Sequence, residues 1–166
     1  MRSGGEQMPF QQLTYEFGTL LVAWEKEHIV YLDFGLNEER ARTYLQEETD
    51  DGELPKAWRM AFDRYAVGDQ QALDALPCQL RVTPFAEQVL HALRTVTFGQ
   101  TISYGELARM IGKPKAARAV GGALNRNPIA LIYPCHRVIG ATGKLTGFAS
   151  GIAHKEALLA HEIGEN

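Results

Sequence analysis

The residues with the clearest capacity for chemistry are Cys135 and His136, in the run Pro134–Cys135–His136–Arg137–Val138. A thiolate is a strong nucleophile, and a nearby imidazole or cation raises its population. An apolar run, residues 129–133, comes directly before, so we expect a buried strand or extended segment that ends at the cysteine and is held by Pro134. Neighbouring residues of an extended chain point to opposite sides, so His136 would need a bend or a bridging water to reach Cys135. The alternative is an inert buried cysteine beside a core histidine.

A carboxylate near the carboxyl terminus could complete this arrangement. The pattern predicts a last helix from Ala153 to about Ile163, with Leu158 and Leu159 turned inward and Glu162 near its end. Glu162 could orient His136, as the acid does in other nucleophile–base–acid arrangements. The alternative is a solvated surface residue.

The segment between these residues is rich in glycine. Residues 140–151 contain four glycines, which lets a loop bring its backbone close to a ligand. Phe148 offers an aromatic wall in this loop.

Two short helices are expected upstream of the cysteine. Ser103 and Glu106 form a capping box, S-x-x-E, that begins a helix ending at Met110. Gly112–Lys113–Pro114 interrupts it, and a second helix follows from about Lys115 to Leu124. A further helix precedes the pair, with Thr83 as cap and Pro84 in its first turn. Two short helices joined by a tight turn make a helix-turn-helix, which either binds DNA or serves as scaffold.

The second of these helices is nearly bare of large side chains. In Ala116–Ala117–Arg118–Ala119–Val120–Gly121–Gly122–Ala123, only Arg118 is large and polar. Reading base edges requires several such side chains, whereas a bare face suits close approach to a groove with one side chain inserted into the base stack. The alternative is tight packing of small residues against a neighbouring helix, with Arg118 in a surface ion pair.

The first half indicates a small α/β unit. Residues 11–34 predict a hairpin, residues 38–48 a helix capped by Asn37, and residues 53–67 a helix with Pro55 near its first turn. Residues 77–82 predict a short strand or an extended linker. The expected fold class is therefore α+β, with an N-terminal α/β supporting domain at 1–82. A mostly helical domain with a winged-helix-like helix-turn-helix follows at 83–166 and contains the candidate cysteine.

Composition and charge narrow the class of protein. Of 166 residues, 45% are hydrophobic and 22% charged, which argues against a disordered chain and against a membrane protein. Two cysteines cannot form a disulfide framework, and Cys78 is interpreted as structural. Residues 1–83 carry a net charge of −7 and residues 84–166 a net charge of +4, so a polyanion would meet the second half, unless acidic surface helices simply lie early. No apolar leader or spanning segment is seen, which predicts a cytoplasmic protein, or a nuclear one in a eukaryote.

Taken together, these residues resemble a known family. The chain resembles the O6-alkylguanine-DNA alkyltransferases, also called methylated-DNA–protein-cysteine methyltransferases. The resemblance lies in the run around Cys135, in residues 116–121 and Asn127–Pro128 before it, and in residues 158–162 after it. The likeness is ordered from Thr83 to Glu162, and the first half matches only in general layout.

The resemblance implies specific chemical roles. Cys135 would accept the alkyl group from guanine O6, His136 would take the thiol proton through a water, and Glu162 would hold the imidazole. Tyr104 would protonate the departing guanine, and Asn127 would hold the turn that carries the active-site segment.

The resemblance also implies DNA-binding and pocket residues. Arg118 would fill the space left by the flipped nucleotide, and the DNA would be contacted by Tyr104, Ser103, Ala116, Ala117 and Gly121. The guanine pocket would be lined by Val138, Phe148, Ala149, Ser150 and Leu124.

Several positions depart from the family pattern. Phe148 replaces a frequent tyrosine, which removes a hydroxyl contact and keeps the stacking surface. Ser150–Gly151 replaces a frequent Gly-Gly pair and could narrow the pocket, so bulky alkyl groups should react less well, as a comparison of methyl with benzyl adducts would test. Some members bind zinc in the first domain, but residues 1–77 hold no cysteine and one histidine, His28, so no metal and no cofactor are expected.

The leading hypothesis is single-use repair of O6-alkylguanine, chiefly O6-methylguanine, in duplex DNA. The expected partner is double-stranded DNA carrying the lesion, with a monomer in solution, no membrane partner, and cooperative binding to DNA left open. One alternative is a lesion-binding or regulatory DNA module without transfer. Another is a Cys–His hydrolase or thiol enzyme, which would turn over repeatedly on a small ester or amide.

Overall fold

The first half of the computed structural model is a four-stranded sheet with helices on both faces. The structure describes residues 8–35, 38–45, 49–140 and 152–164. The sheet order is β3-β2-β1-β4, and its strands are β1 (Met8–Tyr15), β2 (Gly18–Glu25), β3 (His28–Phe34) and β4 (Thr49–Asp51). Consecutive strands β1, β2 and β3 pair antiparallel, and β4 pairs parallel to β1.

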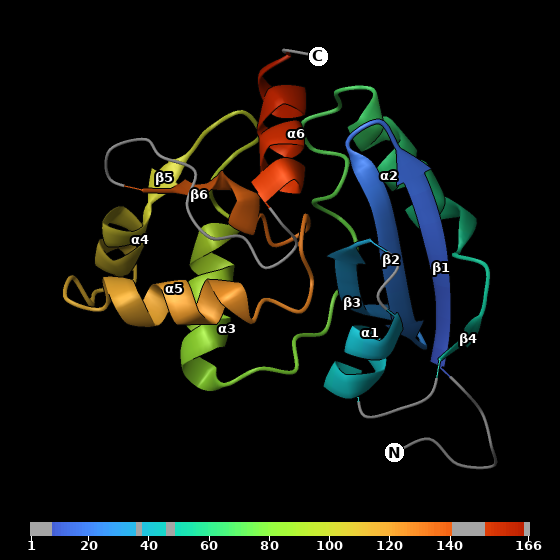
Figure 1. Ribbon diagram of the computed structural model, residues 1–166, viewed down its shortest axis with the longest axis horizontal. Helices are drawn as coiled ribbons and strands as arrows, with labels where there is room; N and C mark the ends of the chain where they lie inside the picture. The colour runs from blue at the N-terminus through green and yellow to red at the C-terminus, as the bar shows by residue number, and fades with distance from the viewer. Residues whose placement is uncertain (1–7, 36–37, 46–48, 141–151, 165–166) are drawn as a thin grey trace.

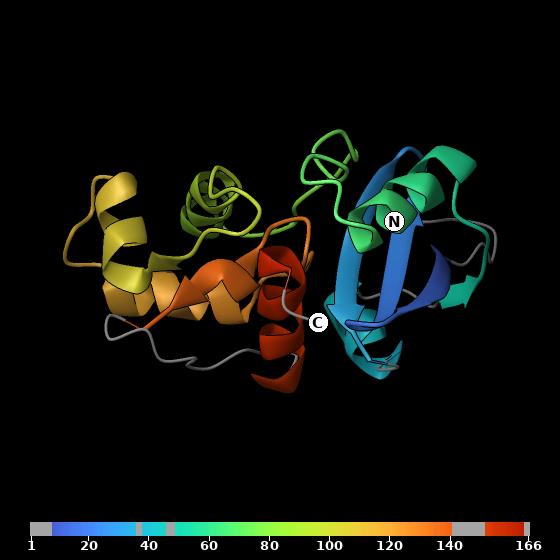
Figure 2. The same cartoon turned by 90° about the horizontal axis from the view of Figure 1, so that it is seen from above.

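Both faces of this sheet are buried. Helix α1 (Glu38–Leu45) packs Ala41 and Leu45 against one face. Helix α2 (Lys56–Ala66) packs Phe62 and Tyr65 against the other (Figure 2). The central strand β2 is accordingly buried on both sides along most of its length.

The predicted elements of the first half are confirmed with shifted ends. The hairpin predicted over residues 11–34 is present as β2 and β3, but the chain also turns at residues 16–17, so residues 8–15 form a separate strand, β1, that the sequence did not predict. The predicted helices are α1 and α2, and Pro55 lies immediately before α2. Asn37, the predicted cap of α1, lies outside the described residues.

The second half is mostly helical (Figure 1). It contains the helices α3 (Pro84–Leu93), α4 (Tyr104–Met110), α5 (Ala117–Asn125) and α6 (Ile152–Ile163), the 3₁₀ helix η1 (Cys135–Arg137), and the parallel strands β5 (Ile102–Ser103) and β6 (Val138–Ile139).

The local signals for two of these helices are confirmed. The Thr83 hydroxyl accepts a hydrogen bond from the Ala86 amide, and Pro84 occupies the first turn of α3. Ser103 and Glu106 form the reciprocal capping box of α4, with both hydrogen bonds at 3.1 Å. These side chains satisfy backbone N–H groups that a helix start leaves unpaired.

The predicted strand before Cys135 is wrong beyond its first residue. Ile129 forms an isolated bridge with Leu32, and the chain then turns: the Ile132 amide donates to the Ala130 carbonyl at 2.8 Å, around Leu131 at φ 71°. This is a γ-turn with a positive φ, a conformation rare outside glycine. Proline lacks an amide donor, so Pro134 cannot continue a ladder, and Cys135 is delivered by the 3₁₀ helix η1.

The two halves meet along the edge strand β3. Its Ile29 bridges Cys78, which confirms an extended segment there, and its Leu32 exchanges backbone hydrogen bonds of 2.9 Å with Pro128 and Ala130. One apolar cluster contains residues from both halves, from Leu13 to Leu158. The first half therefore supports the segment that leads to Cys135. In the described part of the chain, no helix is long and apolar enough to span a membrane.

Candidate active site

Cys135 is the first residue of η1 and is 9% exposed. Burial raises the pKa of its thiol to about 11. The Asn127 amide and the charge of Lys155 lower the pKa of the thiol, and the charge of Asp33 raises it, but burial outweighs them. At neutral pH the thiol is therefore protonated, and a reaction at sulfur needs a proton acceptor.

The next residue, His136, is fully buried and suited to accept a proton. Its Nε2 lies 2.7 Å from Glu162 Oε2. Burial lowers its pKa, and Glu162 opposes that shift only in part, so the imidazole is neutral near pH 7. Because an ionised carboxylate can only accept, the neutral ring carries its proton on Nε2 and leaves Nδ1 as an acceptor. Nδ1 is buried and has no hydrogen-bond partner among the described residues.

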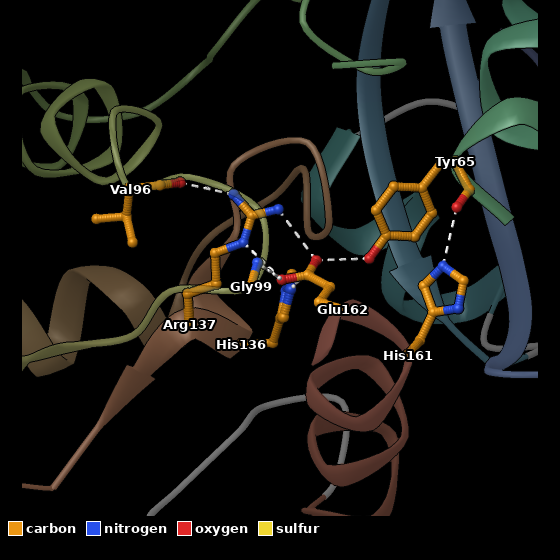
Figure 3. A network of polar contacts seen from close by, with 7 residues as sticks. All are labelled: Tyr65, Val96, Gly99, His136, Arg137, His161 and Glu162. Carbon is orange, nitrogen blue, oxygen red and sulfur yellow. Dashed lines mark hydrogen bonds and ion pairs between the residues drawn. The ribbon is translucent and has the colours of Figure 1, made fainter. Parts of the chain in front are cut away.

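The carboxylate of Glu162 is buried at the centre of a polar network (Figure 3). Arg137 binds it through Nε at 2.8 Å and Nη2 at 3.0 Å, the Tyr65 hydroxyl donates at 2.6 Å, and the Gly99 amide at 3.4 Å. Burial alone would raise the pKa of Glu162, but His136 and Arg137 hold it well below its usual range. The solvated alternative for Glu162 is therefore wrong, because this carboxylate is ionised inside the protein.

Asn127 closes the turn that carries Cys135. Its Nδ2 donates to the Tyr133 carbonyl at 2.9 Å, and its Oδ1 accepts from the Ile129 amide at 3.0 Å. The side chain thus holds both ends of the segment 129–133 and also faces the thiol. The role that the resemblance implies for Asn127 stays a prediction, and these two contacts support it.

Comparison with known proteins decides the family. The methylated-DNA–protein-cysteine methyltransferase of Methanosarcina acetivorans is 41% identical over 155 residues, which cover 87% of this chain and 92% of the relative. This chain belongs to the methylated-DNA–protein-cysteine methyltransferase family. The relative of the same description in Haemophilus influenzae is 39% identical, over 87% of this chain and 80% of its own length.

Family model and fold agree with this assignment. The DNA-binding domain of 6-O-methylguanine DNA methyltransferases matches residues 84–164. The crystal structure of the O6-methylguanine methyltransferase of Mycobacterium tuberculosis has a TM-score of 0.80 at 37% identity and covers 96% of this chain, with 94% of its own length matched. The same protein has been crystallised in complex with DNA, and that structure has a TM-score of 0.79 at 38% identity. The α+β fold class is confirmed as that of this methyltransferase family.

The predicted DNA-facing residues of this family member cluster on α4 and α5. Arg118 is exposed on α5, which begins at Ala117 directly after Ala116. Tyr104 begins α4 and packs on α5, where a Cβ at Gly121 would lie 3.7 Å from its ring. The pairing of Ser103 with Ile139 joins this surface to the strand that follows η1.

The predicted pocket residues divide into two groups. Val138, directly after η1, and Leu124, on α5, are both buried. Phe148, Ala149 and Ser150, with the Ser150–Gly151 departure, lie outside the described residues.

Sequence reasoning missed three residues of this site. Lys155 is fully buried, and its Nζ donates to the Val138 carbonyl at 2.5 Å, close enough to the thiol for their charges to interact. Its spacing to Leu158 and Glu162 places all three on the buried face of α6, a signal that the sequence does contain. Arg137 belongs to the cysteine motif, but the sequence alone assigned it no role. Tyr65 lies 97 residues from Glu162, and no local pattern points to it.

Cys78 occupies a different environment. It is half-buried, its Sγ donates weakly to the Leu76 carbonyl, and burial raises its pKa to about 11. The charge of Arg94 lowers the pKa of Cys78 but does not outweigh burial, and the structural role of this thiol stays a prediction.

Proposed function

We propose that this methyltransferase repairs O6-alkylguanine, chiefly O6-methylguanine, in duplex DNA, with Cys135 as the alkyl acceptor. The observation that carries this assignment is the buried chain of groups from the Cys135 thiol through a neutral His136 to an ionised Glu162. These groups supply a nucleophile, an acceptor for its proton and a fixed charge that stabilises the protonated acceptor.

The transfer itself is a displacement at the alkyl carbon. The Cys135 proton passes through a water to His136 Nδ1, and Sγ forms a bond to the alkyl carbon as the bond from that carbon to guanine O6 breaks. The electron pair of the broken bond stays on guanine, which takes a proton from the Tyr104 hydroxyl. The Lys155 charge stabilises the developing thiolate.

The product is a thioether, which does not hydrolyse. Each molecule of protein therefore reacts once, and the protein acts as a stoichiometric reagent.

Access to the lesion requires the nucleotide to leave the base stack, at a cost of a few kcal/mol. In our proposal Arg118 enters the stack, while Ser103, Tyr104, Ala116, Ala117 and Gly121 lie against the backbone. Small side chains on α5 permit close approach of that helix to the groove. The net charge of +4 on residues 84–166 favours contact with the polyanion.

The remaining predictions concern organisation and surroundings. We propose that residues 1–82 support a DNA-binding and acceptor domain at 83–166, that the protein is a monomer in solution, and that Val138 and Leu124 line the guanine pocket. A cytoplasmic location stays a prediction from the sequence.

The two cysteines allow a matched test. A duplex with one O6-methylguanine labelled in its methyl group is mixed with wild-type protein, Cys135→Ser and Cys78→Ser. We expect wild type and Cys78→Ser to take up the label and Cys135→Ser to take up none. Label on Cys135→Ser would contradict the assignment, and lesion binding by the wild type without label uptake would favour the non-transferring module.

A further inference from the structure

The Tyr65 hydroxyl brings the first half of the chain to the reacting groups. It donates to Glu162 Oε2 at 2.6 Å, the same oxygen that lies 2.7 Å from His136 Nε2 (Figure 3). The other described donors to this carboxylate, Gly99, His136 and Arg137, belong to the second half. Tyr65 comes from α2, so one carboxylate oxygen joins the two halves.

The Tyr65 side chain is firmly held in this position. It is 2% exposed, and its ring meets Phe17 and Phe98 edge-on at centroid distances of 5.5 and 5.6 Å. Its backbone carbonyl accepts a hydrogen bond of 2.8 Å from Nε2 of His161, the neighbour of Glu162. Both ends of Tyr65 are therefore tied to the end of α6.

The Tyr65 hydroxyl is the third donor to Glu162 Oε2, beside His136 Nε2 and Arg137 Nη2, and this has an electrostatic consequence. Burial and the charge of Glu162 raise the pKa of Tyr65 far above its ordinary value, so the hydroxyl remains a donor over the working pH range. Each hydrogen bond to Oε2 draws negative charge away from the contact with His136. Without the hydroxyl, the carboxylate would stabilise protonated His136 more strongly, and a protonated imidazole cannot accept the thiol proton.

The charged and titratable groups around His136 come from several elements. They are Cys135 and Arg137 of η1, Lys155, His161 and Glu162 of α6, Asp33 of β3 through its effect on Cys135, and Tyr65 of α2. Among these, Tyr65 is the one whose hydroxyl can be removed with its ring packing retained.

We propose that Tyr65 is a positioning residue for the transfer reaction, whose hydroxyl fixes Glu162 Oε2 and thereby lowers the pH at which His136 becomes able to accept a proton. This inference rests on the proposed function. It assigns the first half a part in the chemistry in addition to support.

The test is the pH profile of single-turnover methyl transfer for wild type and Tyr65→Phe, from about pH 5 to about pH 9. We expect the acidic midpoint of Tyr65→Phe to lie about half a pH unit higher, with the plateau rate at high pH within about twofold of wild type. The matched control is Tyr15→Phe, which removes another tyrosine–carboxylate hydrogen bond, to Asp63 at 2.7 Å, away from Glu162. Its midpoint should equal that of wild type.

Several outcomes would overturn the proposal. A lower plateau with an unchanged midpoint would mean that Tyr65 is merely structural. If Tyr65→Phe does not fold, His161→Phe decides, because it keeps an aromatic ring and releases the Tyr65 carbonyl. It should shift the midpoint in the same direction, and an unchanged midpoint would refute the proposal. Absence of transfer by wild type would instead refute the proposed function.

Discussion

At the scale of single residues, the site places a neutral thiol and a neutral imidazole among buried charges. Cys135 and His136 are both uncharged near pH 7, while the ionised Glu162 and the buried Lys155, whose pKa is lowered by burial, lie on one face of α6. Burial keeps the resting thiol protonated, and the fixed charges favour the charge separation that develops during transfer.

Replacement of Lys155 by methionine should slow transfer. The methionine fills a similar volume but removes the positive charge that lowers the pKa of Cys135. We therefore expect the rate of methyl transfer to fall by up to about tenfold. Single-turnover transfer from a methylated duplex measures this. Lys56→Met is the control, because Lys56 is exposed on α2, in the half of the chain that is not assigned to DNA. An unchanged rate for Lys155→Met would contradict the electrostatic role.

The buried histidine predicts a loss of stability in acid. The folded-state pKa of His136 is lowered, so below about pH 6.5 the unfolded chain binds a proton that the folded chain does not. The free energy of unfolding should then fall with decreasing pH, by up to about 1.4 kcal/mol per pH unit for this group. Glu162, whose pKa is also lowered, adds a further loss below about pH 4.3.

Urea unfolding at a series of pH values measures this dependence. His91→Gln serves as the control for loss of a histidine, because His91 is exposed on α3. A constant free energy of unfolding between about pH 7 and about pH 5 would contradict the prediction.

At the scale of elements, the helices α4 and α5 form the surface that we assign to DNA. Arg118→Ala should weaken repair by about tenfold with little change in preference for flanking sequence, because an inserted side chain does not read base edges. Lesion-duplex affinity, measured for several flanking sequences and salt concentrations, tests this. Arg59→Ala is the control, since Arg59 lies on α2 in an exposed ion pair with Asp63. A changed sequence preference would show that Arg118 reads bases.

Elements with local signals were predictable, and those set by distant contacts were not. The caps at Thr83 and Ser103 act within three residues, so the starts of α3 and α4 follow from the sequence. The turn at Leu131 depends on backbone bonds to β3, a strand about a hundred residues earlier, and an apolar run alone predicts a strand there instead. His136 could be predicted because it lies in a local sequence motif. Tyr65 could not, because only tertiary contacts bring it to the site.

At the scale of the whole molecule, the halves share a core and a hydrogen-bonded carboxylate. The apolar cluster crosses residue 82, and the Tyr65–Glu162 bond joins α2 to α6. We therefore expect one cooperative unfolding transition. Both tryptophans, Trp24 and Trp58, lie in the first half, while α3 to α6 lie in the second. Tryptophan fluorescence and far-ultraviolet circular dichroism should give the same urea midpoint, and two separate midpoints would contradict a shared core.

The most direct test of alkyl transfer is the intact mass of the protein after incubation with excess duplex containing one O6-methylguanine, followed by peptide mapping. We predict a gain of the mass of one methylene per protein, located on the peptide that contains Cys135, with no further gain however long the incubation. An unchanged mass, a gain on a peptide without Cys135, or repeated turnover with unmodified protein would contradict it.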